Sequence, residues 1–490
     1  MGFTYMLDRH DVLVVGTGVA GLSAALAAHQ SGASVLVIDR APQDEYGGNT
    51  RYTEAFLRMT DMDSVSDDFE ERFLENSGWY PDPVMVSEMA SDRENWPSIV
   101  SSLPMNDPDV ISRFSERAGP TLRWLNQVGI KFETASTPFL TTSTTRLAPI
   151  GGGYAIVEAL REELIRLEVR IEYETTATGL ITKDDGSISG LLCDAKDKGR
   201  ICLEAKAVLL CCGGFEGSTE MLSRYIGPRA SFIRPIARGG FYNKGEGIRM
   251  AIDIGASVSG EFGLFHAEPM DPRSGKPEAA IFGYPYGILI NKMGNRFVDE
   301  ARGSVDATYE RVTRQIMQQP EGLAYALFDD KTTDIPRFST SIRTDQPPLQ
   351  ADSIQSLAGQ MNIPSKALEK TISEYNRCCL DGSFEFSKPD GLATQGLTPS
   401  KSNWARPIDR QPYRAYPMIA GNVFTFGGLK VDPDARVLNQ DGRPIPGLYA
   451  AGETMGIYFN DYVGSTSVLR GATFGKLAGE HAAGRRHSNQ

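Results

Sequence analysis

The chain has 490 residues and a formal net charge of −12, with 41% hydrophobic and 23% charged residues. A chain of this length exceeds what one ordinary hydrophobic core fills, so two structural domains are expected. The composition is that of a folded globular protein. Its negative charge repels phosphate backbones and therefore argues against a nucleic-acid partner.

The sequence also predicts where the protein resides. The most apolar run, residues 12–28, is interrupted by three glycines, so no membrane span is expected. The opening segment MGFTYMLDRH lacks a basic region followed by an apolar stretch, and no secretion signal is expected. The six cysteines have neither CxxC nor metal-ligand spacing, which predicts no metal site. Together these features predict a cytoplasmic protein with reduced cysteines.

A βαβ unit opens the chain. The apolar run DVLVV at 11–15 predicts a strand, GTGVAG at 16–21 a turn, and the small residues at 22–30 a helix. A second strand, 34–38, ends at Asp39. A glycine pattern alone is weak evidence, but a strand before it, a helix after it and an acidic residue at the end of the next strand are typical of a dinucleotide site.

Each residue of this unit has a physical task in such a site. Gly16 permits the tight turn, Gly18 lets the backbone approach a pyrophosphate, and Gly21 lets helix and strand pack closely. The helix N-terminus offers unpaired N–H groups and partial positive charge to the phosphates. Asp39 is expected to accept hydrogen bonds from a ribose diol.

The rest of the chain predicts further strands and helices. Residues 171–212 contain short strands around a hairpin turn at Asp185-Gly186, and the last of them, 207–212, ends at Gly213-Gly214. The stretch from about 232 to 412 has helical periodicity at 309–318 and 365–378 and is interpreted as a separate domain. A buried strand at 447–452 and a helix at 467–483 close the chain.

Three glycine-containing segments favour FAD over NAD. Gly47-Gly48-Asn49-Thr50 closely follows Asp39, while Gly213-Gly214 and Gly452-Glu453 each end a strand, where open parallel sheets hold their ligands. One extended ligand that touches both the first βαβ unit and a C-terminal segment suits FAD, because an NAD domain needs no C-terminal element.

Several stretches in a fixed order resemble a known family. They are DVLVVGTGVAGLSAALAAHQSGASVLVIDR, GGNTRYT, VLLCCGGFEGSTEMLSRYIGP, NKGEGIRMAIDIGA, GILINKMGNRFVDE, FTFGGLKVDPDARVL and GLYAAGE. The chain resembles the flavoprotein superfamily of fumarate reductase and succinate dehydrogenase, and within it the tricarballylate dehydrogenase type. The resemblance implies an α/β fold with a Rossmann-like FAD-binding domain of glutathione-reductase type, formed by residues 1–232 and 413–490. An α+β capping domain, 233–412, is inserted between them.

The resemblance also implies how FAD is held. Glu453 would hold the ribityl chain, Ala177 would meet the adenine through its backbone, and Ser467 and Val468 would face the flavin pyrimidine carbonyl. Members with covalent flavin carry a histidine near the GG segment, whereas YGGNTRYT has none, so non-covalent FAD is expected. The predicted FAD-binding residues are Gly16, Gly18, Val19, Ala20, Gly21, Asp39, Arg40, Gly47, Gly48, Asn49, Thr50, Ala177, Cys212, Gly213, Gly452, Glu453, Ser467 and Val468.

The family's catalytic pattern is only partly present. Its reductases use an arginine four residues after the glutamate of an RF-x-x-E motif as proton donor; here RFVDE ends at Glu300, but Ser304 occupies that position and Arg302 lies two residues earlier. His266 aligns with the first substrate histidine of the family, while the second position is Val423. The departure favours dehydrogenation over reduction.

The segment NDYVGSTSVLR, residues 460–470, is similar to the NxYPG stretch of 3-ketosteroid dehydrogenases, where a tyrosine polarises the substrate carbonyl. Tyr462 matches that residue and is the first candidate for proton acceptor, with Arg302 the second. Arg470 either binds a substrate carboxylate or is a charge on a helix surface. His266 and Tyr462 also have structural interpretations, as a hydrogen-bonded histidine and a buried aromatic residue. Glu300 is expected to be a structural or flavin-side carboxylate rather than a base.

These features predict an FAD-dependent oxidoreductase acting on CH–CH bonds. It would remove the proton alpha to a carboxylate or ketone and pass a hydride from the neighbouring carbon to flavin N5. One alternative is a fumarate-reductase-like enzyme running the same chemistry backwards. Another is a non-catalytic flavin-binding subunit for electron transfer or partner binding. The small-molecule substrate and the electron acceptor are not identified by the sequence.

Overall fold

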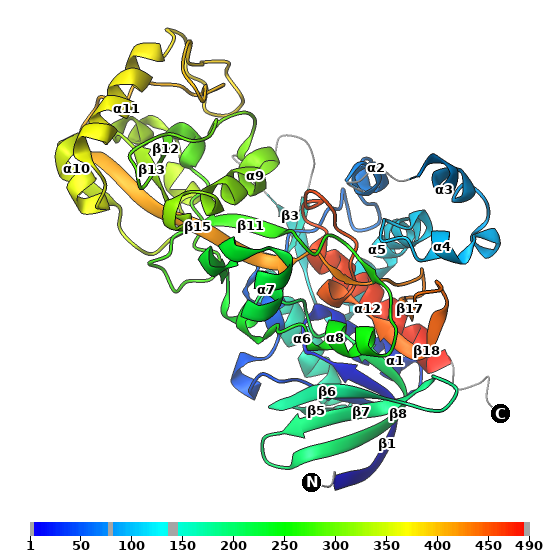
Figure 1. Cartoon of the computed structure of the whole chain (residues 1–490). Coiled ribbons are helices and arrows are strands. Elements are labelled where there is room, and N and C mark those ends of the chain that lie inside the picture. Colours follow the sequence, from blue (N-terminus) through cyan, green and yellow to red (C-terminus); the bar gives the residue numbers. More distant parts are fainter. Residues whose placement is uncertain (1–3, 77–81, 136–145, 485–490) are drawn as a thin grey trace.

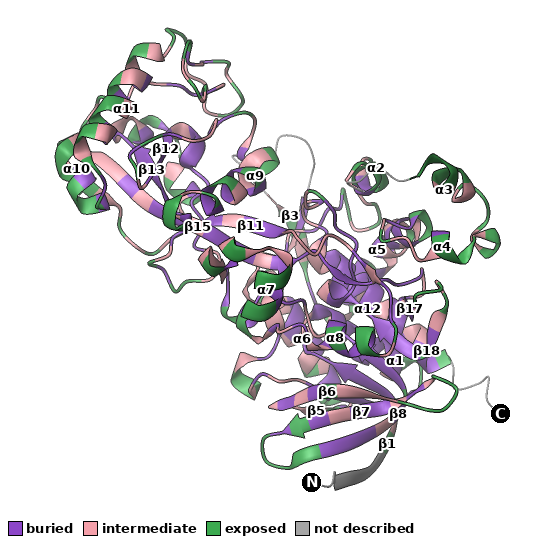
Figure 2. Ribbon diagram, viewed as in Figure 1, coloured by how far each residue is buried: buried purple, intermediate pink, exposed green. Residues whose placement is uncertain are grey.

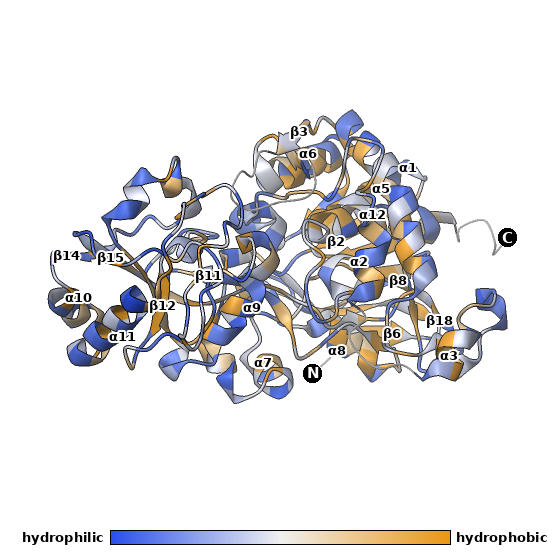
Figure 3. Cartoon of the chain, turned by 90° about the horizontal axis from the view of Figure 1, so that it is seen from above, coloured by the Kyte–Doolittle hydropathy of each residue, from blue (hydrophilic) through white to orange (hydrophobic). Residues whose placement is uncertain are grey.

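The computed structural model describes residues 4–76, 82–135 and 146–484, so the first three residues of the segment searched for a secretion signal lie outside it. Two parts, each built on its own large sheet, lie side by side (Figures 1 and 3). Over the described ranges, no helix is both long and apolar enough to cross a bilayer.

The larger sheet contains the predicted βαβ unit. Its main path runs β17-β18-β8-β1-β2-β5, while β6 and β7 extend it from β8 as an antiparallel hairpin. From β18 to β5 neighbouring strands are parallel. Strand β8 contains most of the strand expected at 207–212, but it already begins at Gly199. The bounds are β1 Thr4–Val15, β2 Val35–Ile38, β5 Arg170–Glu172, β6 Thr175–Thr182, β7 Ile188–Ala195, β8 Gly199–Leu210, β17 Arg436–Leu438 and β18 Pro444–Ala450.

Two helices from opposite ends of the chain pack together in this part. They are α1 (Val19–Gln30) and α12 (Ser467–Gly484), and both are buried along most of their length (Figure 2). Small residues permit the contact, because a Cβ on Gly475 would lie 2.3 Å from the Ala20 carbonyl oxygen. Both predicted helices are therefore confirmed, and their packing brings the C-terminal segment beside the glycine turn.

The second sheet combines strands of the predicted insert with a long strand that follows it. Strand β15 pairs with β9, β11, β13 and β14, and β12 pairs with β13. The sheet therefore extends beyond residue 412, and the predicted domain boundaries stay a prediction. The bounds are β9 Ile233–Pro235, β11 Phe265–Met270, β12 Ile288–Asn291, β13 Ala324–Phe328, β14 Leu349–Ala351 and β15 Tyr413–Thr425.

Helices cover this second sheet and complete the first part. The predicted helices at 309–318 and 365–378 correspond to α9 (Val305–Met317) and α11 (Ser365–Cys378), and α10 (Ile354–Met361) packs beside α11. The remaining elements are α2 Phe69–Glu75, α3 Pro83–Glu88, α4 Ser98–Ser101, α5 Pro108–Val128, α6 Gly152–Arg166, α7 Thr219–Tyr225, α8 Glu246–Asp253, β3 Phe132–Ala135, β4 Arg146–Pro149, β10 Val258–Ser259 and β16 Gly428–Leu429.

Candidate functional site

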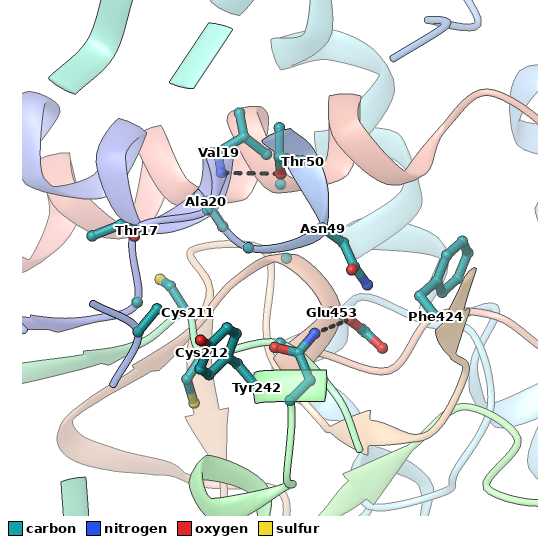
Figure 4. Close-up of a pocket in the computed structure, with 18 of the residues that line it drawn as sticks. Thr17, Val19, Ala20, Asn49, Thr50, Cys211, Cys212, Tyr242, Phe424 and Glu453 are labelled. Carbon is teal, nitrogen blue, oxygen red and sulfur yellow. Dashed lines mark hydrogen bonds between the residues drawn. The ribbon is translucent and has the colours of Figure 1, made fainter. Parts of the chain in front are cut away.

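A cavity of about 1290 Å³, open to solvent, lies where the glycine turn, the segment after Asp39 and the C-terminal segment meet. All predicted FAD-binding residues line it except Gly21 and Gly47. Figure 4 shows Val19 and Thr50 on one wall, Cys211, Cys212 and Tyr242 on the other, and Glu453 and Phe424 towards one end.

The three glycines of the turn have different surroundings. Gly16 has φ +108°, and a Cβ on it would lie 2.3 Å from the Cys211 carbonyl oxygen. A Cβ on Gly21 would lie 1.9 Å from the Gly16 oxygen, so Gly21 serves packing and does not line the cavity. The Cβ position of Gly18 is 3.7 Å from the nearest described atom, Oγ1 of Thr50. The space in front of Gly18 thus stays open for a ligand, as a bound pyrophosphate requires.

Asp39 is held in place by the turn itself. Its carboxylate accepts hydrogen bonds from the Thr17 backbone N–H at 2.7 Å, the Thr17 hydroxyl at 2.5 Å and the Ala41 N–H at 2.7 Å. Burial nevertheless raises its pKa above the ordinary value. The Thr17 hydroxyl also accepts from the N–H of Gly47, whose φ is +101°. Thr17, which the sequence analysis did not single out, therefore connects the first βαβ unit to the GGNT segment.

Arg40, another predicted FAD-binding residue, also has partners within the protein. Arg40 donates to the Tyr242 carbonyl at 3.1 Å and forms an ion pair with Glu246. Burial raises the pKa of the Cys212 thiol to about 12, so this cysteine is held as a thiol rather than a reactive thiolate. None of the described residues that line the cavity is a histidine.

Glu453 faces a buried carboxyl group, Glu216, which was not predicted from the sequence. Glu453 accepts from the Thr425 N–H at 2.7 Å, and the Asn243 amide approaches it at 3.4 Å. Glu216 accepts from the side-chain amides of Asn49 and Asn243, each at 2.6 Å. Burial and then the charge of Glu453 raise the pKa of Glu216 well above its usual range. This side of the cavity is therefore a network of amides and carboxyls suited to a ligand with many hydroxyl groups.

Arg470 is buried, with 1% of its surface exposed, so its interpretation as a helix-surface charge is wrong. One Nη atom donates to the Met455 carbonyl at 3.1 Å. The guanidinium lies over the ring of Tyr458, 4.6 Å from its centre, and 5.7 Å from that of Phe424. It lines the cavity together with Ser467, Val468 and Gly471 of the same helix, α12.

Tyr462 caps helix α12. Its hydroxyl accepts hydrogen bonds from the N–H groups of Thr466, at 2.9 Å, and Ser467, at 3.0 Å, and donates to the Ser467 hydroxyl at 3.0 Å. Tyr462 is not among the residues that line the cavity. The structure gives this side chain a role in fixing the helix N-terminus, and its catalytic role stays a prediction.

His266 lies in β11 within a buried polar cluster. Its Nδ1 is 2.6 Å from Oε1 of Glu310, and its Nε2 is 3.7 Å from Oε1 of Glu268. Its ring contacts that of Tyr462, with the ring centres 4.4 Å apart and the planes tilted by 47°. His266 does not line the cavity, so its substrate role also stays a prediction.

Arg302 is exposed and lies outside the residues that line the cavity. Nothing in its placement supports it as a proton donor or acceptor. Glu300, in contrast, is fully buried and pairs with Arg296 at 2.6 Å while it accepts from the Leu289 N–H at 2.9 Å. This carboxylate is structural, as expected.

Glu278 lines the cavity and was not predicted from the sequence. It has φ +51°, a conformation that costs energy in a non-glycine residue and often marks functional sites. Its N–H donates to the carbonyl of Ile236, another residue of the cavity wall, at 3.3 Å. Burial and then the charge of Glu54 raise its pKa to about 7, although Arg343 lies 3.9 Å away. No motif surrounds Glu278 in the sequence, so only the fold could reveal it.

Across the described ranges, no group of three or more His, Cys, Asp or Glu side chains is arranged to hold a metal ion.

The open glycine turn, the acidic residue at the second strand and the hydroxyl-binding network define an extended dinucleotide site.

The chain belongs to the FAD-binding domain family, whose model matches residues 11–467. "Fumarate reductase (cytochrome)" of Shewanella frigidimarina is 26% identical to it over 97% of this chain and 77% of that protein. The 3-oxosteroid 1-dehydrogenase of Mycobacterium tuberculosis is 25% identical over 98% of this chain and 99% of its own. The open conformation of a flavocytochrome c3 fumarate reductase shares the fold, with a TM-score of 0.77 at 23% identity over 98% of this chain and 79% of that one. The predicted superfamily, fold class and FAD cofactor are confirmed.

Proposed function

We propose that the chain is an FAD-dependent oxidoreductase that dehydrogenates a CH–CH bond next to a ketone or carboxylate. Bound FAD supplies the acceptor for the hydride. The observation that supports this most directly is the extent of the cavity. Besides the glycine turn and Glu453, the residues that line it include Tyr52, Ile236, Phe424 and Glu278. We call this part of the wall the substrate arm, because it offers a substrate a place beside the cofactor.

The chain's own residues would position the substrate and remove its alpha proton. Glu278 is the carboxyl group in this arm, and its raised pKa suits a general base near neutral pH. Tyr462 remains a candidate, but its hydroxyl is already occupied at the N-terminus of α12. The exposed position of Arg302 makes it the weakest of the three.

The substrate is proposed only by class. The relatives include a fumarate reductase and a 3-oxosteroid dehydrogenase, which act on a dicarboxylate and a ketone respectively by their names. A carboxylate or a ketone can each stabilise the enolate that forms when the alpha proton leaves. The electron acceptor remains open, and the cytoplasmic location stays a prediction.

A reductase of an activated double bond is the second candidate. A carboxyl group with a pKa of about 7, as in Glu278, is protonated in a large fraction of molecules at neutral pH and can donate a proton as well as accept one. Several relatives are named as reductases, including a vinyl phenol reductase and a urocanate reductase. A non-catalytic flavin protein is disfavoured because the cavity wall includes residues beyond those predicted to bind FAD, among them Ile236 and Glu278.

Anaerobic mixing tests the proposal and its direction. The oxidised holoenzyme is mixed with saturated ketones, including 3-ketosteroids, and with di- and tricarboxylic acids, and flavin bleaching is recorded. The photoreduced holoenzyme is mixed with the matching enones and enoates, and reoxidation is recorded. Bleaching by a saturated compound supports dehydrogenation, and reoxidation alone supports the reductase. A flavin that light reduces but that no compound bleaches or reoxidises would contradict both.

A further inference from the structure

We propose that Arg470 acts on the flavin rather than on the substrate: its guanidinium is a fixed positive charge that stabilises the negative charge the ring gains on reduction, and so raises the reduction potential. The inference rests on the FAD enzyme proposed above but not on its substrate or direction.

The cavity itself indicates where the ring lies. The open space at Gly18 and the N-terminus of α1 suit the pyrophosphate, and Asp39 suits the ribose of the adenosine half. The flavin half of the dinucleotide must then extend the other way, past Asn49 and Glu453. In that direction one face of α12 lines the cavity with Ser467, Val468, Arg470 and Gly471.

The charge of Arg470 is permanent and weakly screened. A guanidinium stays protonated in proteins, and burial of this one keeps solvent ions from screening it. Its Nε is buried and has no hydrogen-bond partner among the described residues, and one Nη donates to a neutral carbonyl, that of Met455. An incompletely satisfied buried guanidinium on a cavity wall is an arrangement that a negatively charged group would complete.

Nearby groups leave room for that role. Arg470 also acts on the Glu453 carboxyl: burial raises the pKa of Glu453, while hydrogen bonds with Glu216 and Thr425, and then the charge of Arg470, offset only part of that rise. The N-terminus of α12, held by the Tyr462 hydroxyl, adds a partial positive charge on the same wall. A buried cation and the positive end of a helix dipole therefore lie on the same wall of the cavity. On this placement both would stabilise the negative charge that the flavin ring gains on reduction.

The alternative is that Arg470 binds a substrate carboxylate. The two roles separate when no substrate is present, because only a residue that acts on the flavin changes the flavin's own equilibrium. The variants are Arg470→Met, which keeps most of the length without the charge, and Arg470→Lys, which keeps the charge. Arg377→Met, on the exposed surface of α11, is the matched control.

The midpoint potential is measured by spectroelectrochemical titration of each holoenzyme without substrate, and sulfite affinity is measured as a second report of positive charge beside the ring. Arg470→Met is expected to shift the reduction equilibrium towards oxidised flavin about 10- to 100-fold, or roughly 30–60 mV for the two-electron couple. Its sulfite affinity falls by a similar factor. Arg470→Lys keeps most of both values, and Arg377→Met leaves them unchanged.

A potential and a sulfite affinity of Arg470→Met equal to wild type, with FAD bound at full stoichiometry, would overturn the inference. An unchanged potential together with a raised KM for a carboxylate probe such as succinate would reassign Arg470 to substrate binding. Arg470→Gln, which keeps a hydrogen-bond donor, provides the same comparison if the Met variant does not retain FAD. Because the readouts need no substrate, they stand even if no compound of the mixing panel reacts.

Discussion

Replacement of Gly18 by alanine tests whether the fold or the binding of FAD requires a glycine at this position. Gly18 has φ −65° and ψ 175°, which alanine adopts without strain. The added Cβ would lie no closer than 3.7 Å to a described atom, which is ordinary van der Waals contact. The fold alone therefore gives no reason for a glycine at this position. Gly18→Ala is expected to stabilise the apoprotein slightly, by about 0.4–1 kcal/mol, because it reduces the freedom of the unfolded chain.

The same methyl group occupies the space that a pyrophosphate would use. If it displaces the phosphates from even one backbone N–H, the loss is about 1.5–3 kcal/mol, the contribution of a hydrogen bond to a charged group. At roughly 1.4 kcal/mol per factor of ten, the Kd for FAD rises about 10- to 100-fold. Gly21→Ala is the control with the opposite profile, since its Cβ would meet the Gly16 oxygen at 1.9 Å. It is expected to destabilise the apoprotein by about 1–3 kcal/mol or more.

The assay has two parts. Apoprotein is prepared by removal of FAD, thermal unfolding is followed by circular dichroism, and FAD is then titrated in while quenching of flavin fluorescence is recorded. Gly18→Ala should unfold at or slightly above the wild-type temperature and bind FAD more weakly, while Gly21→Ala should unfold earlier. Wild-type FAD affinity in Gly18→Ala, or a loss of apoprotein stability as large as that of Gly21→Ala, would refute the reasoning.

Three further predictions concern the chemistry. Acid precipitation should release all flavin into the supernatant as intact FAD, detected by chromatography and mass spectrometry; flavin retained in the pellet would mean a covalent link. Glu278→Gln should slow flavin reduction by a substrate about 10²- to 10⁴-fold. In the wild type, burial and Glu54 raise the Glu278 pKa to about 7, with Glu268 and Arg343 as the other charges of its surroundings, so the carboxylate base forms above that pH. The rate of dehydrogenation should therefore rise with pH through about 7, and that of reduction should fall; a flat stopped-flow profile in both directions would argue against Glu278. Tyr462→Phe should lose the cap of α12 and with it about 1 kcal/mol of the free energy of unfolding, measured in denaturant. Flavin reduction should slow only modestly. A loss of rate above about 100-fold with unchanged stability would instead support Tyr462 as the base.

The nucleotide half of the site was predictable because its residues are close together in the sequence. The strand, turn, helix and second strand at 11–39 are one contiguous unit, and the spacing of Gly16, Gly18 and Gly21 fixes their separate tasks. Asp39 needed no other part of the chain, since Thr17 and Ala41 hold it. Local geometry of this kind can be inferred from local sequence.

The other half depends on contacts between distant segments, and there the prediction was weaker. Glu216 meets Glu453 across more than two hundred residues, and Glu278 reaches the cavity wall beside Ile236. Neither carries a motif. Arg470 shows a different limit: its helix was predicted, but a helix with small residues on several faces gives no clear indication of which charged side chain turns inward.

Strand β15 explains how a change in the second sheet can reach the flavin. The strand is hydrogen-bonded to four strands of that sheet, yet Val423 and Phe424 near its end line the cavity. There the Val423 carbonyl accepts from Asn49 at 2.9 Å, the ring of Phe424 lies under Arg470, and the Thr425 N–H holds Glu453. One continuous strand thus connects the second sheet to the cavity wall, to Glu453 and to Arg470. A shift of the second sheet along β15 would move the charges beside the flavin as well as the substrate, so substrate binding and flavin potential should be coupled in this protein.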